Sequence, residues 1–164
     1  MPTFGNASIE LATELWQELR RRVPTWFQAC LNDQGEDSAS FMTWLMMRRV
    51  TWIRTRDVVV FLVPKEQRHV VEVHLALMSM PLASLHLELC ELMQWIFALG
   101  WRRIEIPVTE VAGRSIRKTL REMGFQKEGT MRQATRGFDR RLGQERYMDV
   151  DLWSILKEGD TNGL

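Results

Sequence analysis

Apolar residues recur at helical spacing in three stretches of the chain, with polar residues between them. Residues 8–22 predict a first helix, and the hydroxyl of Ser8 can cap it by accepting from unpaired backbone N–H groups. Residues 84–98 predict a long helix that ends at Gly100, and residues 112–123 predict a further helix. The outer face of this last helix is basic, with Arg114, Arg117, Lys118 and Arg121.

Two shorter apolar segments, residues 24–31 and 41–49, are also expected to be helical. The polar residues 32–40 between them contain Gly35 and predict a loop. In residues 41–49 the apolar side chains are too dense for periodicity to distinguish a helix from a strand.

Segments rich in β-branched residues predict the strands. The first two flank a short polar turn and predict a hairpin, and the third is expected to run antiparallel to the second. In the third strand, alternation places Glu72 and His74 on the same face. A strand, a helix and a strand then follow in succession, which predicts a right-handed crossover and a parallel pair. The predicted strands are 50–55, 58–64, 70–77, 101–108, 125–137 and 146–156.

This order of elements predicts an α/β (α+β) fold with a mixed, mostly antiparallel central sheet flanked by helices. The 164 residues are enough for one domain with a sizeable core. We expect a helical N-terminal part (1–49), a sheet with two helices (50–156) and a polar tail (157–164).

Charge is unevenly distributed, although the net charge is only +1. Residues 102–146 hold 12 Lys and Arg against 6 Asp and Glu. Such a segment attracts phosphate, nucleic acid or an acidic protein, or it simply forms a solvated charged face, which is the commoner case. We expect no nucleic-acid partner, because no helix-turn-helix, RNP or zinc motif accompanies the basic residues.

Seven Trp and ten Met residues are spread along the chain. Core filling is the simpler explanation, and an adaptable partner surface is the alternative. A protein partner or self-association is therefore an expectation from the sequence.

Cys30 and Cys90 lie far apart in apolar surroundings, which predicts buried free thiols, a reducing compartment and a cytoplasmic location. The three histidines lack ligand spacing, so no metal site is expected. We expect no membrane association, because the sequence shows neither a signal-peptide pattern nor an apolar run of membrane-spanning length.

The C-terminal half, "RRIEIPVTEVAGRSIRKTLREMGFQKEGTMR" followed by "RYMDVDLWSILKEG", resembles the GCN5-related N-acetyltransferase (GNAT) superfamily, in particular its ribosomal-protein N-acetyltransferase branch. The resemblance covers roughly the last two-thirds of the chain and implies a GNAT-like fold. The family usually opens with a strand, and "MPTFG" gives a weak strand signal. The matching positions are Ser115, Gly124-Phe125, Glu128-Gly129, Arg132, Asp149 and Ser154-Ile155-Leu156.

The resemblance implies that acetyl-CoA is held between residues 70–77 and the long helix. In the family a glycine-rich loop turns backbone N–H groups onto the pyrophosphate at the helix N-terminus. Here the turn contains no glycine and no Arg or Gln, Pro81 lacks an N–H group, and Ser84 caps the helix. The residues expected at this degenerate coenzyme position are Leu77, Met78, Ser79, Pro81, Ala83 and Ser84.

The following helix departs from the family as well. Ala112 aligns with an Asn that often contacts the coenzyme, and Ser115 with the Ser of the same motif. Thr119 aligns with a Tyr that commonly protonates the leaving thiolate, and threonine is too weakly acidic for that role. These departures favour a GNAT-fold protein that has lost acetyl-CoA binding, has no cofactor and serves as a protein-interaction or structural module. One setting is a virion or accessory protein of a phage.

The alternative is an active N-acetyltransferase that transfers acetyl from acetyl-CoA to an amine at an atypical donor site. Glu72 stands where many family members carry a general base that acts through water. In this alternative the strand at Leu75–Leu77 offers a backbone donor to the thioester carbonyl. The basic face of residues 114–121 holds the 3′-phosphate of the coenzyme.

Overall fold

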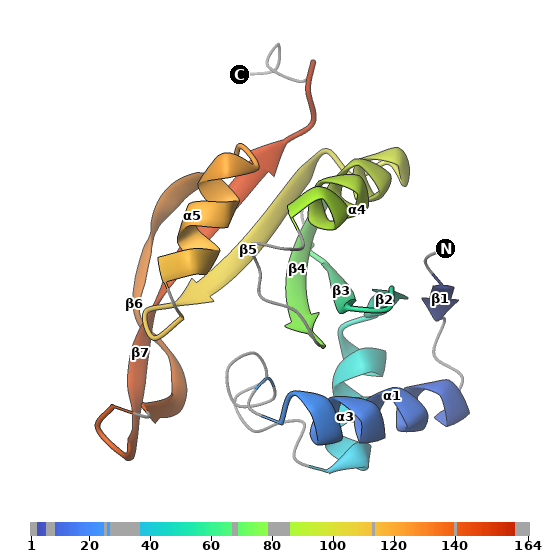
Figure 1. Cartoon of the computed structure of the whole chain (residues 1–164), viewed down its shortest axis with the longest axis vertical. Coiled ribbons are helices and arrows are strands. Elements are labelled where there is room, and N and C mark those ends of the chain that lie inside the picture. The colour runs from blue at the N-terminus through green and yellow to red at the C-terminus, as the bar shows by residue number, and fades with distance from the viewer. Residues whose placement is uncertain are drawn as a thin grey trace.

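The computed structural model describes residues 3–5, 9–24, 26, 37–66, 69–78, 86–112, 114–139 and 141–159. A seven-stranded sheet with the order β1-β2-β3-β4-β5-β7-β6 forms its centre (Figure 1). The strands are β1 (Thr3–Gly5), β2 (Thr51–Arg54), β3 (Val58–Pro64), β4 (Val70–Leu77), β5 (Arg103–Thr109), β6 (Gln126–Asp139) and β7 (Gln144–Leu156). The helices are α1 (Ile9–Arg22), α3 (Ser38–Met47), α4 (His86–Ala98) and α5 (Arg114–Glu122).

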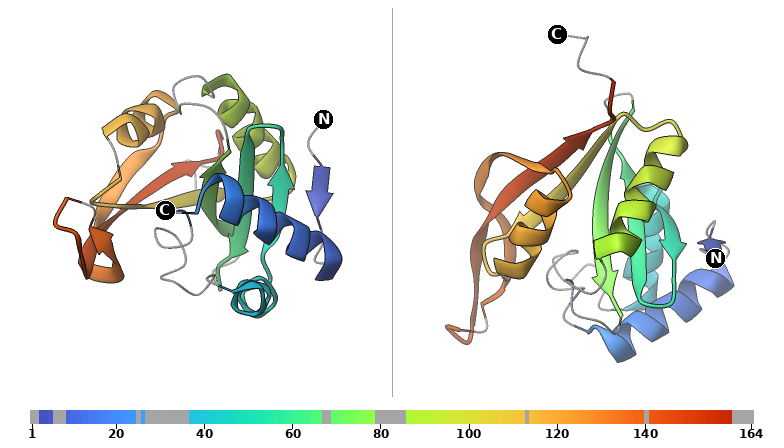
Figure 2. Two further views of the ribbon diagram at one scale, coloured as in Figure 1. Left: turned by 60° about the horizontal axis from the view of Figure 1, so that its bottom comes forward. Right: turned by 45° about the horizontal axis from the view of Figure 1, so that its top comes forward.

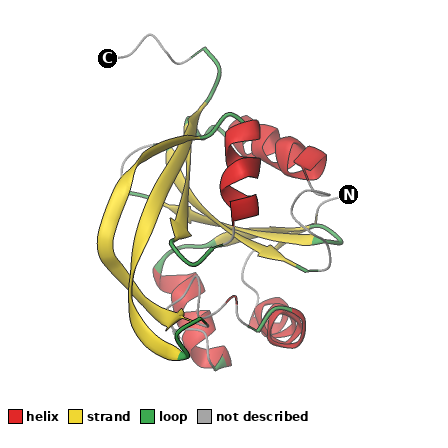
Figure 3. Cartoon of the chain, turned by 60° about the vertical axis from the view of Figure 1, so that its left-hand side comes forward, coloured by secondary structure: helices red, strands yellow, loops and turns green. Residues whose placement is uncertain are grey.

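The sheet separates two apolar cores, and helices cover both of its faces (Figure 3). On one face α4 and α5 pack through residues such as Leu89 and Leu120. On the other face α1 and α3 pack through residues such as Leu19 and Phe41. β3 contributes alternate residues to the two cores, so every residue from Val58 to Val63 is buried. This two-sided burial explains the continuous apolar run of β3.

The predicted strand pairing is confirmed. β2 and β3 form the expected hairpin, β4 runs antiparallel to β3, and β4 and β5 are parallel across the α4 crossover. β6 and β7 form the last hairpin, with register shifts between Lys127 and Gly129 and between Met131 and Thr135. The predicted fold class, a mixed and mostly antiparallel sheet flanked by helices, is therefore correct.

The N-terminal segment departs from the prediction. Residues 3–5 form β1, which pairs with β2 from Thr3↔Arg54 to Gly5↔Trp52. An edge strand needs only one row of backbone bonds, so a weak side-chain pattern was a poor guide here.

Two helical predictions have different outcomes. Helix α3 begins at Ser38, inside the predicted loop, because the Asp37 carboxylate accepts from the N–H of Ser40 at 2.7 Å and caps it. Most of the predicted helix 24–31 lies outside the described residues, as do Ser8 and Cys30.

None of the helices in the described part of the chain is long and apolar enough to span a membrane.

Candidate functional site

The parallel strands β4 and β5 pair only over their first residues. Their register runs from Val70↔Arg103 to Glu72↔Glu105, although the strands continue to Leu77 and Thr109. Figures 1 and 2 show the two strands running apart from their shared end. We call residues 73–77 of β4 and 106–109 of β5 the β4–β5 divergence.

The backbone of alternate β4 residues faces this divergence. Lys65 N–H donates to the Val70 carbonyl at 3.1 Å, and Met78 N–H donates to the Asp57 carbonyl at 2.7 Å. These two bonds flank the β3–β4 ladder, so the even-numbered β4 residues bond to β3. The N–H and C=O groups of Val73, Leu75 and Leu77 therefore point towards β5.

An ion-pair network lies where the strands part, on the face that carries α1 and α3. Lys65 Nζ contacts Glu72 Oε2 at 3.2 Å and Glu105 Oε2 at 2.7 Å, which joins the two strands. Arg103 Nε contacts Glu105 Oε1 at 2.8 Å. A cavity of about 490 Å³ is lined partly by Lys65, Glu72 and Glu105. This network holds the start of the divergence together.

Glu72 and His74 lie on one face, as predicted, and His74 Nε2 is 2.8 Å from Glu72 Oε1. Burial tends to raise the pKa of Glu72, but the hydrogen bond and charge of His74 and the charge of Lys65 outweigh it and lower the pKa to about 2. Such a carboxylate stays ionised at neutral pH and has little tendency to take up a proton. The geometry therefore suits Glu72 for holding His74 and Lys65 in place.

Aromatic side chains from α3, from β3 and from Trp26, which follows α1, lie on this face of the divergence. The Trp26 ring stacks on Phe61 with centroids 4.8 Å apart, and Trp44 packs edge-on against Phe61 at 5.6 Å and against His74 at 6.1 Å. Trp26 Nε1 donates to the Leu75 carbonyl at 3.0 Å. These packed aromatic side chains therefore extend to the backbone of β4, which Trp26 contacts through the Leu75 carbonyl.

Basic residues of α5 line a second cavity, of about 500 Å³. Ser115 and Lys118 are exposed there. Arg117 differs from the predicted outer face, because it turns towards the sheet. Its guanidinium donates to the carbonyls of Ala112 at 2.6 Å and Thr109 at 2.9 Å, and it contacts Asp151 at 3.3 Å. The cavity is lined by Arg114, Ser115, Arg117, Lys118 and Arg121.

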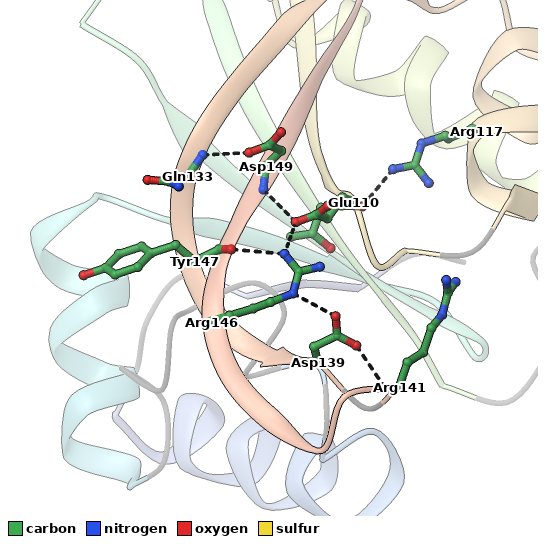
Figure 4. Close-up of polar contacts among 9 residues, drawn as sticks. Glu110, Arg117, Gln133, Asp139, Arg141, Arg146, Tyr147 and Asp149 are labelled. Atoms are coloured by element: carbon green, nitrogen blue, oxygen red, sulfur yellow. Dashed lines mark hydrogen bonds and ion pairs between the residues drawn. The ribbon is translucent and has the colours of Figure 1, made fainter.

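A polar cluster ties the end of β5 to the β6–β7 hairpin (Figure 4). Arg146 contacts Glu110 at 2.6 Å and Asp139 at 2.8 Å, and Glu110 also accepts from the Asp149 N–H at 3.1 Å. The phenol of Tyr147 points away from this cluster and is 62% exposed (Figure 4). β5 therefore stays with β7 where it leaves β4.

The predicted coenzyme residues are only partly described. Leu77 packs against the α4 and α5 core, whereas the Met78 side chain is buried in the α1 and α3 core. Ala112 is partly buried beneath α5. Ser79, Pro81, Ala83 and Ser84 lie outside the described residues. Within the described ranges, no group of three His, Cys, Asp or Glu side chains is arranged to hold a metal ion.

Sequence reasoning missed two residues that contact the divergence, Trp26 and Arg117. Trp26 is separated by 49 residues from its acceptor, so no local spacing indicates the contact. Arg117 looked like one member of a solvated basic face, and only the position of the carbonyls before α5 shows its role.

Several solved structures that are similar to this chain are acetyltransferases. A GNAT-family acetyltransferase from Streptococcus pneumoniae has 17% identity and a TM-score of 0.66, with 96% of this chain and 100% of that chain covered. The ribosomal-protein-alanine N-acetyltransferase from Brucella melitensis has 15% identity and a TM-score of 0.69, with 94% and 99% covered. A GNAT-superfamily phosphinothricin acetyltransferase from Sinorhizobium meliloti, in complex with acetyl-CoA, has 18% identity and a TM-score of 0.66, with 99% and 92% covered.

The chain has the GNAT fold. No protein-family model and no curated protein matches the sequence.

The favoured expectation, a GNAT fold that lost acetyl-CoA and became a structural or phage module, is wrong. The three solved structures named above are acetyltransferases, and the one from Sinorhizobium meliloti is in complex with acetyl-CoA.

The physical reason for this error lies in the weight given to glycine. Glycine lets a phosphate loop adopt backbone dihedral angles that other residues disfavour. The hydrogen-bond donors of such a loop, however, are backbone N–H groups, which every residue except proline provides. In this chain the divergence of β4 and β5 is present without these glycines.

Proposed function

We propose that this protein is an N-acetyltransferase that transfers acetyl from acetyl-CoA to an amine. The observation that carries the proposal is the β4–β5 divergence, where a parallel pair opens after Glu72↔Glu105 in a fold shared with acetyltransferases. The backbone edge of β4 faces the opening, and the ion-pair network of Lys65, Glu72 and Glu105 lies beside it.

The chemistry of this edge fits acetyl-CoA. The pantetheine arm of the coenzyme is extended and carries two amides, so it can pair with an open strand edge as a further strand does. The carbonyl of Val73 and the N–H groups of Leu75 and Leu77 face that opening. In the reaction, the amine nitrogen bonds to the thioester carbon, the C–S bond breaks, and the proton lost by nitrogen balances the one gained by sulfur.

Residues of β4 are suited to polarise the carbonyl. The N–H groups of Leu75 and Leu77 point towards β5, and a fixed backbone donor next to a thioester oxygen stabilises the charge that develops there. This orientation supports a backbone donor at Leu75–Leu77.

We propose that Glu72 and His74 share the handling of the amine's proton. Glu72 keeps its charge because its pKa is about 2, and it holds His74 Nε2 at 2.8 Å. Because an ionised carboxylate can only accept, Nε2 donates to Glu72 and Nδ1 is the ring nitrogen left to take up a proton. In this arrangement Glu72 is a positioning residue and His74 is the proton acceptor.

The α5 cavity is suited to the 3′-phosphate of the coenzyme. Arg114, Lys118 and Arg121 surround it, while Arg117 is engaged with backbone carbonyls and Asp151. Cations next to an open cavity hold a phosphate chiefly by charge.

Acetyl-CoA binding is the first test. A ligand at a hundred times its Kd adds about 2.7 kcal/mol to the free energy of unfolding. We expect the melting temperature to rise with acetyl-CoA and free thiol to be released when suitable amines are added. A melting temperature that does not move at millimolar acetyl-CoA would refute the proposed function.

The α5 site has a sharper test of its own. The double variant Arg114→Gln/Lys118→Gln should bind acetyl-CoA about tenfold more weakly than the wild type does, because two cations are lost. It should bind acetyl-dephospho-CoA, which lacks the 3′-phosphate, as tightly as the wild type does. The matched control is Arg136→Gln, because Arg136 lies on β6 and pairs with Glu145. Equal losses for the two coenzymes would place the 3′-phosphate elsewhere.

A further inference from the structure

Continuing the β4–β5 ladder to the ends of both strands would take four more backbone hydrogen bonds. The pattern follows from the last pair, Glu72↔Glu105, and from the Arg103 N–H, which donates to the His69 carbonyl at 3.2 Å. The four bonds would join Pro107 N to Val73 O, Leu75 N to Pro107 O, Thr109 N to Leu75 O, and Leu77 N to Thr109 O.

The first of these bonds cannot form, because proline has no N–H group. Lys157 N–H donates to the Arg102 carbonyl and Glu110 N–H to the Asp149 carbonyl, each at 2.9 Å. These bonds flank the β5–β7 ladder, so the even-numbered β5 residues bond to β7. The nitrogen of Pro107 therefore faces β4. Its missing N–H removes no hydrogen bond between β5 and β7.

Side chains occupy the acceptors of two more bonds. The Leu75 carbonyl accepts from Trp26 Nε1 at 3.0 Å. The Thr109 carbonyl accepts from Arg117 Nη2 at 2.9 Å and from the Ala112 N–H at 3.0 Å. Three of the four bonds are thus removed or pre-empted, by residues from three separate parts of the chain.

We propose that Trp26, Pro107 and Arg117 are positioning residues that keep β4 and β5 apart. An unpaired strand edge tends to pair with its neighbour, and covering its carbonyls prevents this. The carbonyls of Leu75 and Thr109 are covered while the N–H groups of Leu75 and Leu77 remain turned to the divergence. The exposed edge therefore offers donors, which suits the carbonyl oxygen of a thioester.

The mechanical part of this proposal is independent of the proposed function and can be tested on the protein alone. Pro107→Ala restores the first bond, and Trp26→Phe frees the Leu75 carbonyl while it keeps a ring over Phe61. In the double variant we expect the amides of residues 107 and 109 to be protected from hydrogen exchange. Unprotected amides at both positions would overturn the proposal.

Pro64→Ala is the matched control. Pro64 ends β3, and alternation along β3 turns its nitrogen away from β4. This variant should leave exchange at Thr109 unchanged. A change there equal to that of the double variant would show that losing any strand proline suffices, and would also overturn the proposal.

The connection to catalysis rests on the proposed function and needs a second measurement. Each restored bond should weaken acetyl-CoA binding about fivefold, and the double variant about 25-fold, because the coenzyme must then displace formed backbone bonds. Protected amides with unchanged acetyl-CoA affinity would overturn the role in coenzyme binding. If the wild type bound no acetyl-CoA, the proposed function would fail, while the exchange result would still decide whether these residues hold the strands apart.

Discussion

Removing the charge of Glu72 should reveal how strongly the start of the β4–β5 divergence is held together. Glu72→Gln keeps the size of the side chain but removes its charge from His74 Nε2 at 2.8 Å and from Lys65 Nζ at 3.2 Å. Lys65 keeps its contact with Glu105, so the variant removes one carboxylate from the network and leaves the strands joined.

The magnitude follows from the pKa of Glu72, which is lowered from 4.5 to about 2. A shift of this size corresponds to about 3 kcal/mol of folded-state stability. Because the pKa is depressed on folding, the stabilisation is fully present above about pH 4.5 and is lost as the pH falls towards 2. We therefore expect Glu72→Gln to lower the free energy of unfolding by about 3 kcal/mol at pH 7 and by nearly nothing at pH 2.

Urea denaturation of both proteins at several pH values between 7 and 2 measures this difference. The other carboxylates titrate in both proteins, so their contributions cancel in the comparison. Glu122→Gln is the control, because Glu122 is an exposed partner of Lys118 and should cost less than about 0.5 kcal/mol at any pH. A cost for Glu72→Gln that is the same at pH 7 and pH 2 would refute the electrostatic explanation and indicate lost packing.

Three further predictions concern other parts of the site and fold. His74→Asn should lower kcat about a hundredfold and leave the KM for acetyl-CoA nearly unchanged, since a lost proton acceptor affects the chemical step; steady-state kinetics check this, and an unchanged kcat would remove His74 from the mechanism. Arg117→Met should lower the free energy of unfolding by about 2 kcal/mol, because the Thr109 carbonyl and Asp151 lose a charged donor; an unaltered urea midpoint would contradict this role. Gly124→Ala should lower the free energy of unfolding by about 1 kcal/mol, because the φ of residue 124 is +89°, which alanine disfavours. The added methyl group would lie 3.6 Å from Ile155 Cδ1, in ordinary contact. A loss of several kcal/mol in thermal denaturation would indicate a steric clash instead.

The sequence was a good guide wherever a side-chain pattern repeats within one element. The apolar run of β3 and the alternation of β4 predicted both strands and placed Glu72 with His74, because facing in a strand follows from a period of two. β1 was missed, since pairing at a sheet edge depends on the partner strand more than on three residues of its own.

The functional prediction failed for a related reason. The missing glycines between Leu77 and His86 are a true property of the sequence, but they describe one loop only. The GNAT fold and the divergence of β4 and β5 depend on contacts across the whole sheet. A motif comparison alone therefore gave too much weight to the loop and favoured a protein without a coenzyme.

The sequence by itself determined the order of the strands after β1, the shared face of Glu72 and His74 on β4 and the proline within β5. Each of these follows from chemistry that is local to a few neighbouring residues. Only the tertiary structure decided that the nitrogen of Pro107 faces β4, that Trp26 reaches the Leu75 carbonyl and that Arg117 reaches the Thr109 carbonyl. Hydrogen bonds of this kind depend on which strands become neighbours and in which register, and that is set by packing between residues far apart in the chain.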